Sequence, residues 1–303
     1  MRNGGYKWFR IFLYGLFCVG VTAVLAVSLP QMLLHFYDAG YQDRCGEKVS
    51  LSKILEKNRL SSNDYQIIFE QTGLGRQAVE SLRDRQGYQK DEIQAFQTAI
   101  FSKIKIECRA TSPITRQDRC CSAEVKKLPI APIEDGDILI SFSSHTFGWR
   151  HGHAGIVVDA QEGLCLEALT LGSESELKDL DHWREYSNFA VLRLKNTDAQ
   201  ERKVIAQYAR DCLNGVPYSL LSGLHGKKEA VSNCCGQAQC AYLIWYAFAH
   251  FGYDLDSDGG RIVTVADLAA SSLLDVVQSF HISPEAFYRF EDDKRSKSVK
   301  IRE

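Results

Sequence analysis

Charged residues are distributed very unevenly along the chain. No Asp, Glu, Lys or Arg occurs between Arg10 and Asp38. The apolar run Ile11–Leu29 would extend roughly 28 Å as a helix, which is close to the thickness of the hydrocarbon core of a bilayer. The pattern therefore predicts a transmembrane helix within residues 1–37, with a short stub before it.

Basic residues fix the expected orientation of this helix. Arg2, Lys7 and Arg10 precede it without any acidic residue, and such residues keep that end in the cytoplasm. The alternative is a cleaved signal peptide, for which Val24-Leu25-Ala26 could serve as the cleavage site. The apolar core of a signal peptide spans only about 7–15 residues, whereas this run continues to Leu34. We therefore expect an uncleaved single-pass anchor in the cell membrane, with the C-terminal domain extracytoplasmic.

Residues 38–130 follow a helical pattern and then a turn-rich one. Apolar residues recur at helical spacing from Ile93 through Phe96 and Ile100 to Ile104. The segment 108–134 contains Pro113 and two further prolines, which are typical of turns and loops. We interpret 38–130 as a helical spacer subdomain with a connector, and see no cluster of chemical groups in it.

Short apolar runs typical of strands begin after residue 131. They cover residues 137–142, 153–158, 164–169 and 190–194, and two helices are expected at 198–213 and 238–251. Strands followed by a buried helix indicate an α+β domain over residues 131–290. Residues 291–303 form a charged tail.

The overall charge excludes one class of partner. Lys and Arg number 36, Asp and Glu number 38, and the net charge is −2. A protein that binds nucleic acid through its phosphates carries a clustered excess of basic residues. We therefore expect no nucleic acid partner.

Ten cysteines occur, and Cys18 lies in the apolar run. The odd number of the others suggests one thiol that is kept free in an exported protein. Their pairing cannot be read from the sequence, and two vicinal pairs argue against zinc knuckles with C-x₂₋₄-C spacing. These nine residues are Cys45, Cys108, Cys120, Cys121, Cys165, Cys212, Cys234, Cys235 and Cys240.

Cys240 is the candidate for a reactive thiol. It opens the apolar segment 240–249, directly after a polar loop. A thiol at a helix N-terminus is stabilised as thiolate by the helix dipole. The alternative is a buried structural cysteine, which is a frequent role of this residue.

A nucleophilic thiol requires a base, and the base requires an orienting group. If residue 158 opposes 164 across the short turn 159–163, Gly155 opposes Glu167. Glu167 is then the diagonal neighbour of His153 on the same face of the hairpin, within reach of its imidazole. A slip of one residue would reverse the faces. With Cys240, this pair predicts a Cys–His–Glu triad.

Two metal sites are alternatives to this interpretation. His151, His153 and Glu167 would suit zinc, but no further ligand occurs at a strong zinc spacing. The segment 254–259 resembles the start of a calcium loop, but Val265 occupies the twelfth position, where the calcium motif has Glu. An Asp-rich turn fits this segment better. We therefore expect no metal and no cofactor.

The order of these motifs resembles that of the circularly permuted papain-like amidases, the YiiX/YaeF branch of the NlpC-type cysteine hydrolases. The resemblance covers about residues 134–275. One difference is Ala241, since the family often has Ser after the nucleophile. The motifs that carry the resemblance are Gly136-Asp137-Ile138-Leu139, His153-Ala154-Gly155-Ile156-Val157, Leu166-Glu167-Ala168, Gly215-Val216-Pro217-Tyr218, Cys240-Ala241-Tyr242-Leu243-Ile244-Trp245 and Val263-Thr264-Val265-Ala266-Asp267-Leu268.

The resemblance implies a permuted papain-like fold, in which an antiparallel sheet packs on the helix that carries the cysteine. It implies that Cys240 attacks an amide or ester carbonyl, that His153 transfers the proton and that Glu167 orients His153. The backbone N–H of Cys240 would donate to the oxyanion, with Gln239 or Tyr218 as candidates for the second donor.

Three further expectations concern what the site binds. Trp149, Tyr218 and Tyr242 are candidates to line a substrate cleft, although aromatic residues are more often core. The expected substrate is a cell-wall peptide, with a lipid acyl ester or amide as the enzymatic alternative. A surface binding module with an inactive triad is the alternative from another class.

Overall fold

The structure is a computed structural model, and it describes residues 4–37, 40–42, 46–112, 115–121, 128–146, 149–220, 222–223 and 235–287. The expected charged tail at 291–303 lies outside these residues, and so do Cys45 and Cys234.

Within the described residues the fold is mixed α+β with two antiparallel sheets, in agreement with the expected class. The strands are β1 Gly40–Gln42, β2 Ile104–Ala110, β3 Thr115–Cys120, β4 Ile138–Ser141, β5 Ser144–Thr146, β6 Trp149–Arg150, β7 His153–Asp159, β8 Leu164–Glu167, β9 Glu176–Asp179, β10 Phe189–Leu194 and β11 Leu274–Phe280. The helices are α1 Gly4–Tyr37, α2 Ser52–Leu55, α3 Ser62–Thr72, α4 Arg76–Arg83, α5 Lys90–Phe101, η1 Leu180–Glu185, α7 Ala199–Cys212, α8 Cys240–Ala249, α9 Val265–Ala270 and η2 Pro284–Phe287.

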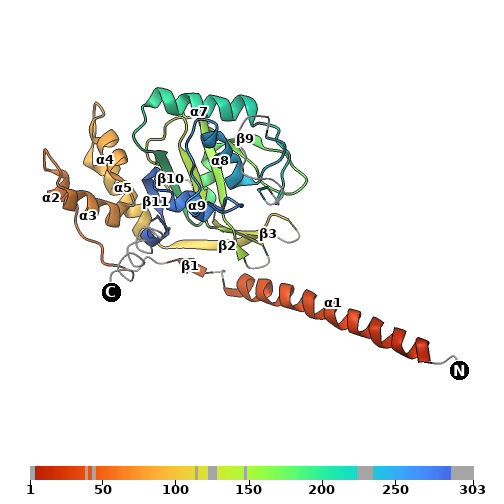
Figure 1. Ribbon diagram of the computed structural model, residues 1–303. Helices are drawn as coiled ribbons and strands as arrows, with labels where there is room; N and C mark the ends of the chain where they lie inside the picture. The colour runs from red at the N-terminus through yellow and green to blue at the C-terminus, as the bar shows by residue number, and fades with distance from the viewer. Residues whose placement is uncertain are drawn as a thin grey trace, which may run out of the picture.

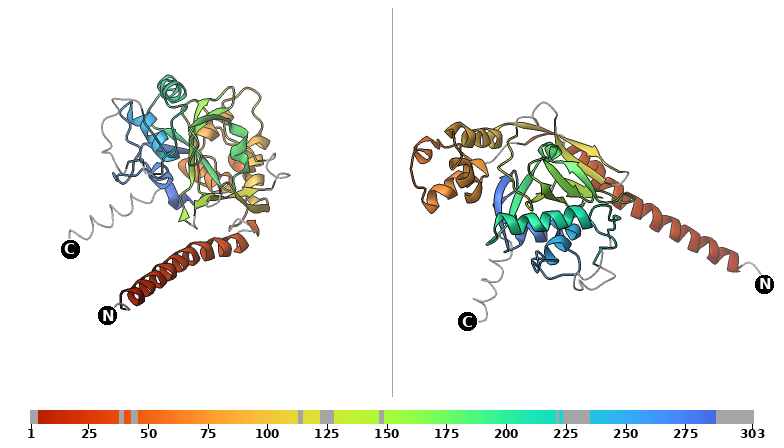
Figure 2. Two further views of the ribbon diagram at one scale, coloured as in Figure 1. Left: turned by 90° about the vertical axis from the view of Figure 1, so that its right-hand side faces the viewer. Right: turned by 90° about the horizontal axis from the view of Figure 1, so that it is seen from above.

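The larger sheet has the strand order β11-β10-β4-β7-β8-β9, and both of its faces are covered. Alternate residues of β4 show this directly. Ile138 and Ile140 pack in the core that contains α7 and α8, whereas Leu139 packs in a second core with residues of α3, α4 and α5. Figures 1 and 2 show these helices on different sides of the sheet. Because neither face of the central strands β10, β4 and β7 meets water, these strands are apolar at most positions rather than alternating, whereas the edge strand β9 is polar and partly exposed.

The region expected to be a helical spacer differs from that expectation in two ways. First, β2 and β3 occupy residues that the pattern assigned to the end of a helix and to a connector. Ile104, which continued the helical spacing, instead begins a strand, and α5 ends at Phe101. The alternation of apolar and polar residues after 104 has a period of two, which overlaps the helical pattern over such a short stretch.

Secondly, the helices of this region pack directly against the larger sheet. Gly75 donates its N–H to the Val277 carbonyl of β11 at 2.8 Å. A Cβ on Gly75 would lie 1.7 Å from the Val276 carbonyl oxygen, so the approach requires glycine. Residues 52–101 therefore form a layer of the same folded unit as the sheet.

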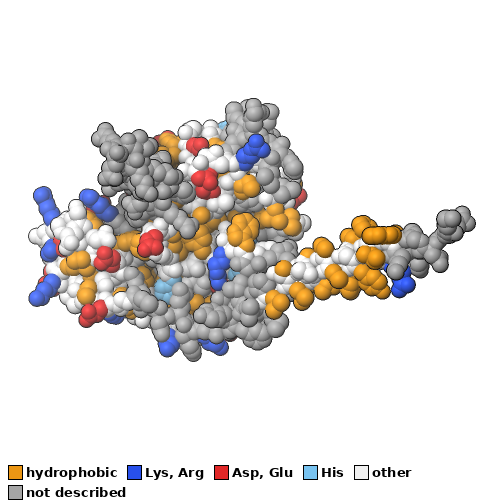
Figure 3. Space-filling view, turned by 60° about the horizontal axis from the view of Figure 1, so that its bottom comes forward, with side chains coloured by type: hydrophobic (Ala, Val, Ile, Leu, Met, Phe, Trp, Pro, Cys, Tyr) orange, Lys and Arg blue, Asp and Glu red, His pale blue; other side chains and the backbone are white. Residues whose placement is uncertain are grey.

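Helix α1 extends away from this unit (Figure 1). Its segment Trp8–Ala26 is long and apolar enough to cross a membrane, and none of it is buried. Figure 3 shows hydrophobic side chains along the visible face of the helix. The second sheet, with the order β1-β2-β3-β5-β6, lies at the end of the domain nearest to α1.

Candidate active site

Cys240 is the first residue of α8, as the sequence predicted. Gln239 is the N-cap, and its side-chain Oε1 accepts the Ala241 N–H at 2.8 Å. Nearly every residue of α8 is buried in the core that it shares with β4 and β7. Cys240, 6% exposed, is thus held at the positive end of a fixed helix.

His153 and Glu167 lie on neighbouring strands in the predicted register. Gly155 of β7 pairs with Glu167 of β8 as expected, whereas Leu164 pairs with Asp159 rather than with residue 158, because a bulge between Val157 and Asp159 shifts the pairing near the turn. The diagonal arrangement brings His153 Nε2 to 2.8 Å from Glu167 Oε2. Both side chains are buried.

Gly155 makes room for this pair. A Cβ at this position would lie 3.0 Å from Glu167 Cγ and 3.2 Å from a ring carbon of Trp183. A larger residue would require the Glu167 or Trp183 side chain to shift slightly. The glycine after His-Ala therefore lets these two side chains pack closely against β7.

The His153 imidazole lies between the carboxylate and the thiol. Its Nε2 is engaged by Glu167, and its side chain also forms a hydrogen bond with Cys240. Burial by itself lowers the pKa of His153. The charge of Glu167 and the hydrogen bonds to Cys240 and Glu167 outweigh burial and raise the pKa of His153 well above 6.5.

Glu167 is surrounded by donors that the sequence did not reveal. Its Oε1 accepts from Trp183 Nε1 at 2.7 Å and from the Cys165 thiol at 3.1 Å, and lies 3.0 Å from His182 Nε2. Burial by itself would raise the pKa of Glu167, but His153 and His182 hold it well below 4.5. Glu167 is thus kept as a carboxylate in a fully buried position.

His182 and Trp183 come from η1, which follows the short edge strand β9. The indole of Trp183 also stacks on His153, with centroids 5.4 Å apart and planes at 12°. No spacing in the sequence distinguishes these two residues, because η1 reaches the site through the strand pairing of β8 with β9.

A cavity of about 430 Å³ opens over the three residues. Tyr218 lines it beside Cys240, and burial followed by the charge of Cys240 raises the pKa of its hydroxyl. The remaining lining combines apolar, polar and charged side chains. It comprises Thr111, Thr115, Gln117, Arg119, Ser144, His151, Gly152, Leu169, Thr170, Lys178, Asp179, His182 and Tyr186.

The other aromatic and polar candidates are not among the residues that line this cavity. Trp149 is 67% exposed and contacts only the ring of His151 among the described aromatic pairs. Tyr242 contacts Trp245 and Tyr246 on α8. The Gln239 Nε2 donates to the Val263 carbonyl, and its Oε1 caps the helix. Both ends of this amide are therefore already hydrogen-bonded within the protein.

The zinc alternative based on His151 is not supported by the geometry. His151 contacts Thr146 Oγ1 at 3.0 Å and the Gly152 carbonyl at 2.8 Å. It belongs to none of the groups of ligating atoms that converge in the described part of the chain. Those groups are Cys108 with Asp118 and His145, Cys165 with Glu167 and His182, and Asp256 with Asp258 and Asp267.

The group around Cys165 is accounted for by the hydrogen bonds to Glu167. Burial, followed by the charge of Glu167, raises the pKa of Cys165 far above its usual value. Cys165 therefore remains a thiol and donates its proton to the carboxylate, rather than acting as a thiolate ligand.

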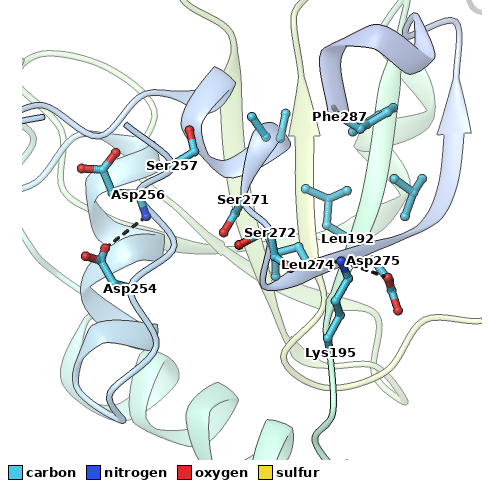
Figure 4. A pocket seen from close by; sticks show the side chains of 13 residues that line it. Leu192, Lys195, Asp254, Asp256, Ser257, Ser271, Ser272, Leu274, Asp275 and Phe287 are labelled. Atoms are coloured by element: carbon cyan, nitrogen blue, oxygen red, sulfur yellow. Dashed lines mark hydrogen bonds and ion pairs between the residues drawn. The ribbon is translucent and has the colours of Figure 1, made fainter. Parts of the chain in front are cut away.

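The segment that resembles a calcium loop is an Asp-rich turn. Asp254 and Asp256 each accept the backbone N–H of the residue two positions later, at 3.1 and 3.4 Å, as in Asx turns. Val265 lies buried in the first turn of α9. This turn borders a separate cavity of about 440 Å³, shown in Figure 4, which shares no lining residue with the cavity at Cys240.

The thiols of Cys165, Cys212, Cys235 and Cys240 are free in the structure. Cys240 therefore meets the requirement for a reduced thiol, and it shares this property with other cysteines. Comparison of the chain with protein-family models, with curated proteins and with solved structures yields no match.

Proposed function

We propose that this protein is a membrane-anchored cysteine hydrolase that cleaves an amide or ester bond through Cys240, His153 and Glu167. One observation carries the proposal: the buried His153 imidazole contacts the Cys240 thiol and the Glu167 carboxylate at the floor of one cavity. A nucleophile, a base and an orienting carboxylate in this order are the components of a catalytic triad. The order of motifs along the chain, which resembles the permuted papain-like amidases, adds to this support.

The raised pKa of His153 determines the starting state of the proposed reaction. At neutral pH the imidazole carries a proton, and its positive charge beside the Cys240 sulfur would stabilise the thiolate that acts as the nucleophile. The thiolate attacks the substrate carbonyl carbon and forms a C–S bond, and the carbonyl electrons move to the oxygen. His153 then gives its proton to the leaving amine or alkoxide as the C–N or C–O bond breaks.

Hydrolysis of the resulting thioester completes the cycle. Neutral His153 takes a proton from water, and the hydroxide attacks the thioester carbonyl. The C–S bond breaks, the acid product leaves and the thiolate–imidazolium pair is restored. Glu167 remains charged throughout, because its four donors stabilise the carboxylate rather than the acid.

Two groups are suited to stabilise the oxyanion. The backbone N–H of Cys240 is at the start of α8, where amides have no acceptor within the helix. The Tyr218 hydroxyl lines the same cavity and is kept protonated by its raised pKa. We assign Tyr218 as the second donor in place of Gln239.

The anchor suggests where the substrate is found. The basic residues before α1 favour an outward-facing domain, which suits a peptide of the cell wall as the leading substrate class. A lipid acyl ester or amide is the second candidate. The observation that favours a lipid is Leu169, which lines the cavity and is 38% exposed, in a domain that α1 would hold at a bilayer.

The direct test is product formation. The full-length chain and its Cys240→Ala variant are incubated with peptidoglycan fragments and, separately, with phospholipid vesicles, and products are identified by mass spectrometry. We expect the wild type alone to release product from one of the two. Product from neither would favour a binding module with an inactive triad.

A second test does not depend on the substrate. The alkylation rate of Cys240 by iodoacetamide is followed against pH in the wild type, in His153→Gln and in the matched control His151→Gln. We expect His153→Gln to slow alkylation at neutral pH at least tenfold and the control to change it much less. Equal rates in all three proteins would disprove the triad.

A further inference from the structure

A second group of cysteine, histidine and acid residues lies in the smaller sheet. Cys108 of β2 pairs directly with Asp118 of β3. His145 of β5 is the cross-strand partner of Arg116 and therefore the diagonal neighbour of Asp118 on the same face. We refer to Cys108, Asp118 and His145 as the His145 cluster.

The residues of this cluster converge on one atom. His145 Nε2 lies 3.3 Å from Asp118 Oδ1 and 3.7 Å from Cys108 Sγ. A single ring nitrogen can share only one proton, so it cannot serve both neighbours with full hydrogen bonds. Moreover, the N···O distance is long beside the usual value of about 2.9 Å for a hydrogen bond.

The same distances fit the edges of a tetrahedral zinc site. With Zn–S of about 2.3 Å and Zn–N and Zn–O of about 2.0 Å, ligand atoms in a tetrahedron lie about 3.6 Å apart for S···N and about 3.3 Å apart for N···O. The observed 3.7 and 3.3 Å are close to both values. All three ligand atoms lie within 4.8 Å of one another.

Burial and charge also suit a cation at this point. Asp118 and His145 are 4% and 1% exposed, while Cys108 is half-buried and gives access from solvent. His145 Nδ1 is buried without a hydrogen-bond partner, so Nε2 alone positions the ring through polar contacts. Arg150 binds Asp118 Oδ2 at 2.6 Å, which leaves Oδ1 for a monodentate bond.

We propose that Cys108, Asp118 and His145 bind a zinc ion, with water as the fourth ligand. Sulfur, nitrogen and oxygen donors from Cys, His and Asp are the ligands that zinc prefers. Binding forms Zn–S, Zn–N and Zn–O bonds and releases the thiol proton of Cys108 to solvent. This inference stands independently of the proposed hydrolase activity.

The position of the cluster gives the ion a structural consequence. Gln117 and Ser144, the sequence neighbours of Asp118 and His145, point to the opposite face of the sheet and line the cavity at Cys240. One zinc ion would join β2, β3 and β5 on the face of the sheet opposite the cavity. It would thereby fix the positions of the strands that carry Gln117 and Ser144.

The test is metal content and cobalt spectroscopy of the full-length chain in detergent. After incubation with zinc and removal of unbound metal, we expect about one zinc per chain in the wild type, and at least a tenfold lower content in Cys108→Ser and His145→Gln. The matched control Cys165→Ser removes a buried thiol that also lies near a histidine and should retain the metal. Cobalt should give a thiolate charge-transfer band in the near ultraviolet.

If the variants fail to fold, a measurement on the wild type alone still tests the proposal. Zinc should slow alkylation of Cys108 at least tenfold, as read by mass spectrometry of the peptide that contains it. The proposal is wrong if the wild type binds no zinc or cobalt, or if the metal is lost from Cys165→Ser and retained by Cys108→Ser.

Discussion

The His153 site, made of Cys240, His153 and Glu167, and the His145 cluster contain nearly the same residue types in opposite arrangements. In the His153 site Nε2 contacts the carboxylate at 2.8 Å, and the imidazole also forms a hydrogen bond with Cys240. Because Glu167 engages Nε2, we infer that the thiol uses the other ring nitrogen. In the His145 cluster the carboxylate and the thiol both face Nε2.

This difference separates two kinds of chemistry. Partners on the two nitrogens of an imidazole allow a proton to be held at one end while the ring is oriented from the other, which is the arrangement of a general base. Partners that converge on one nitrogen leave no such path but surround a point that a metal ion can occupy. Residue composition alone would not distinguish the two sites.

The largest contrast is expected between the two cysteines. Cys240→Ala should reduce the proposed hydrolysis on the order of 10⁴-fold, because it removes the proposed nucleophile. Cys108→Ser should change the hydrolysis rate by less than about tenfold, since Cys108 contacts His145 and does not line the cavity at Cys240. Turnover of the substrate identified by mass spectrometry measures both. Similar losses in the two variants would remove the distinction between the sites.

The second contrast concerns stability and pH. The pKa of Glu167 is held below 4.5, so its contribution to stability is present above pH 4.5 and is lost as the pH falls through the lowered value. The pKa of His153 is raised above 6.5, so its contribution is present below pH 6.5 and is lost as the pH rises through the raised value. The stabilising contributions of Glu167 and His153 are both fully present only between pH 4.5 and 6.5.

Glu167→Gln should therefore destabilise the protein most within that window. We expect a loss of about 3 kcal/mol or more in unfolding free energy at pH 5.5, because a buried charged partner is removed. The loss should be smaller at pH 10. Urea unfolding of both proteins at the two pH values measures it, and an equal loss at both would show that the pair is not ionised as described.

The third contrast tests the oxyanion donor. Tyr218→Phe removes only the hydroxyl and should lower kcat on the order of 10²-fold with a small change in KM, as for loss of one oxyanion donor. The matched control Tyr242→Phe alters a tyrosine that does not line the cavity. Steady-state kinetics decide between a role in the transition state and a role in binding, which would raise KM instead.

The smallest effect is expected at His182, which shares Glu167 with His153. Burial by itself lowers the pKa of His182, but the hydrogen bond and charge of Glu167 raise it. In His182→Gln no second cation opposes protonation of His153, so His153 should lose its proton at a higher pH. The rise in the Cys240 alkylation rate on the alkaline side of the pH profile should therefore move to higher pH. At pH 7 the rate should change by less than about tenfold.

A matched control for this change is His250→Gln, which alters a histidine stacked on Tyr208 away from the cavity. Its alkylation profile should follow the wild type. A profile of His182→Gln that moves to lower pH would mean that His182 supports the protonated state of His153 instead of competing with it.

The fold was predictable where a pattern is local. Strands β4, β7, β8 and β10 and helix α8 match the expected segments within a few residues. Strands β2 and β3 were missed because their residues are less apolar and one apolar residue, Ile104, also suits a helix. The layer formed by α2 to α5 was expected to be separate, since nothing in its own sequence identifies the sheet that it covers.

The sequence by itself determined the long apolar helix at the N-terminal end, the start of α8 at Cys240, and the common face of His153 and Glu167. These depend on an uncharged run, on a helix boundary and on the two-residue period of a short hairpin, all of which are local properties. Only the tertiary structure brought His182 and Trp183 to Glu167 and Cys108 to His145, because contacts between distant segments depend on strand order and register, which no local pattern contains.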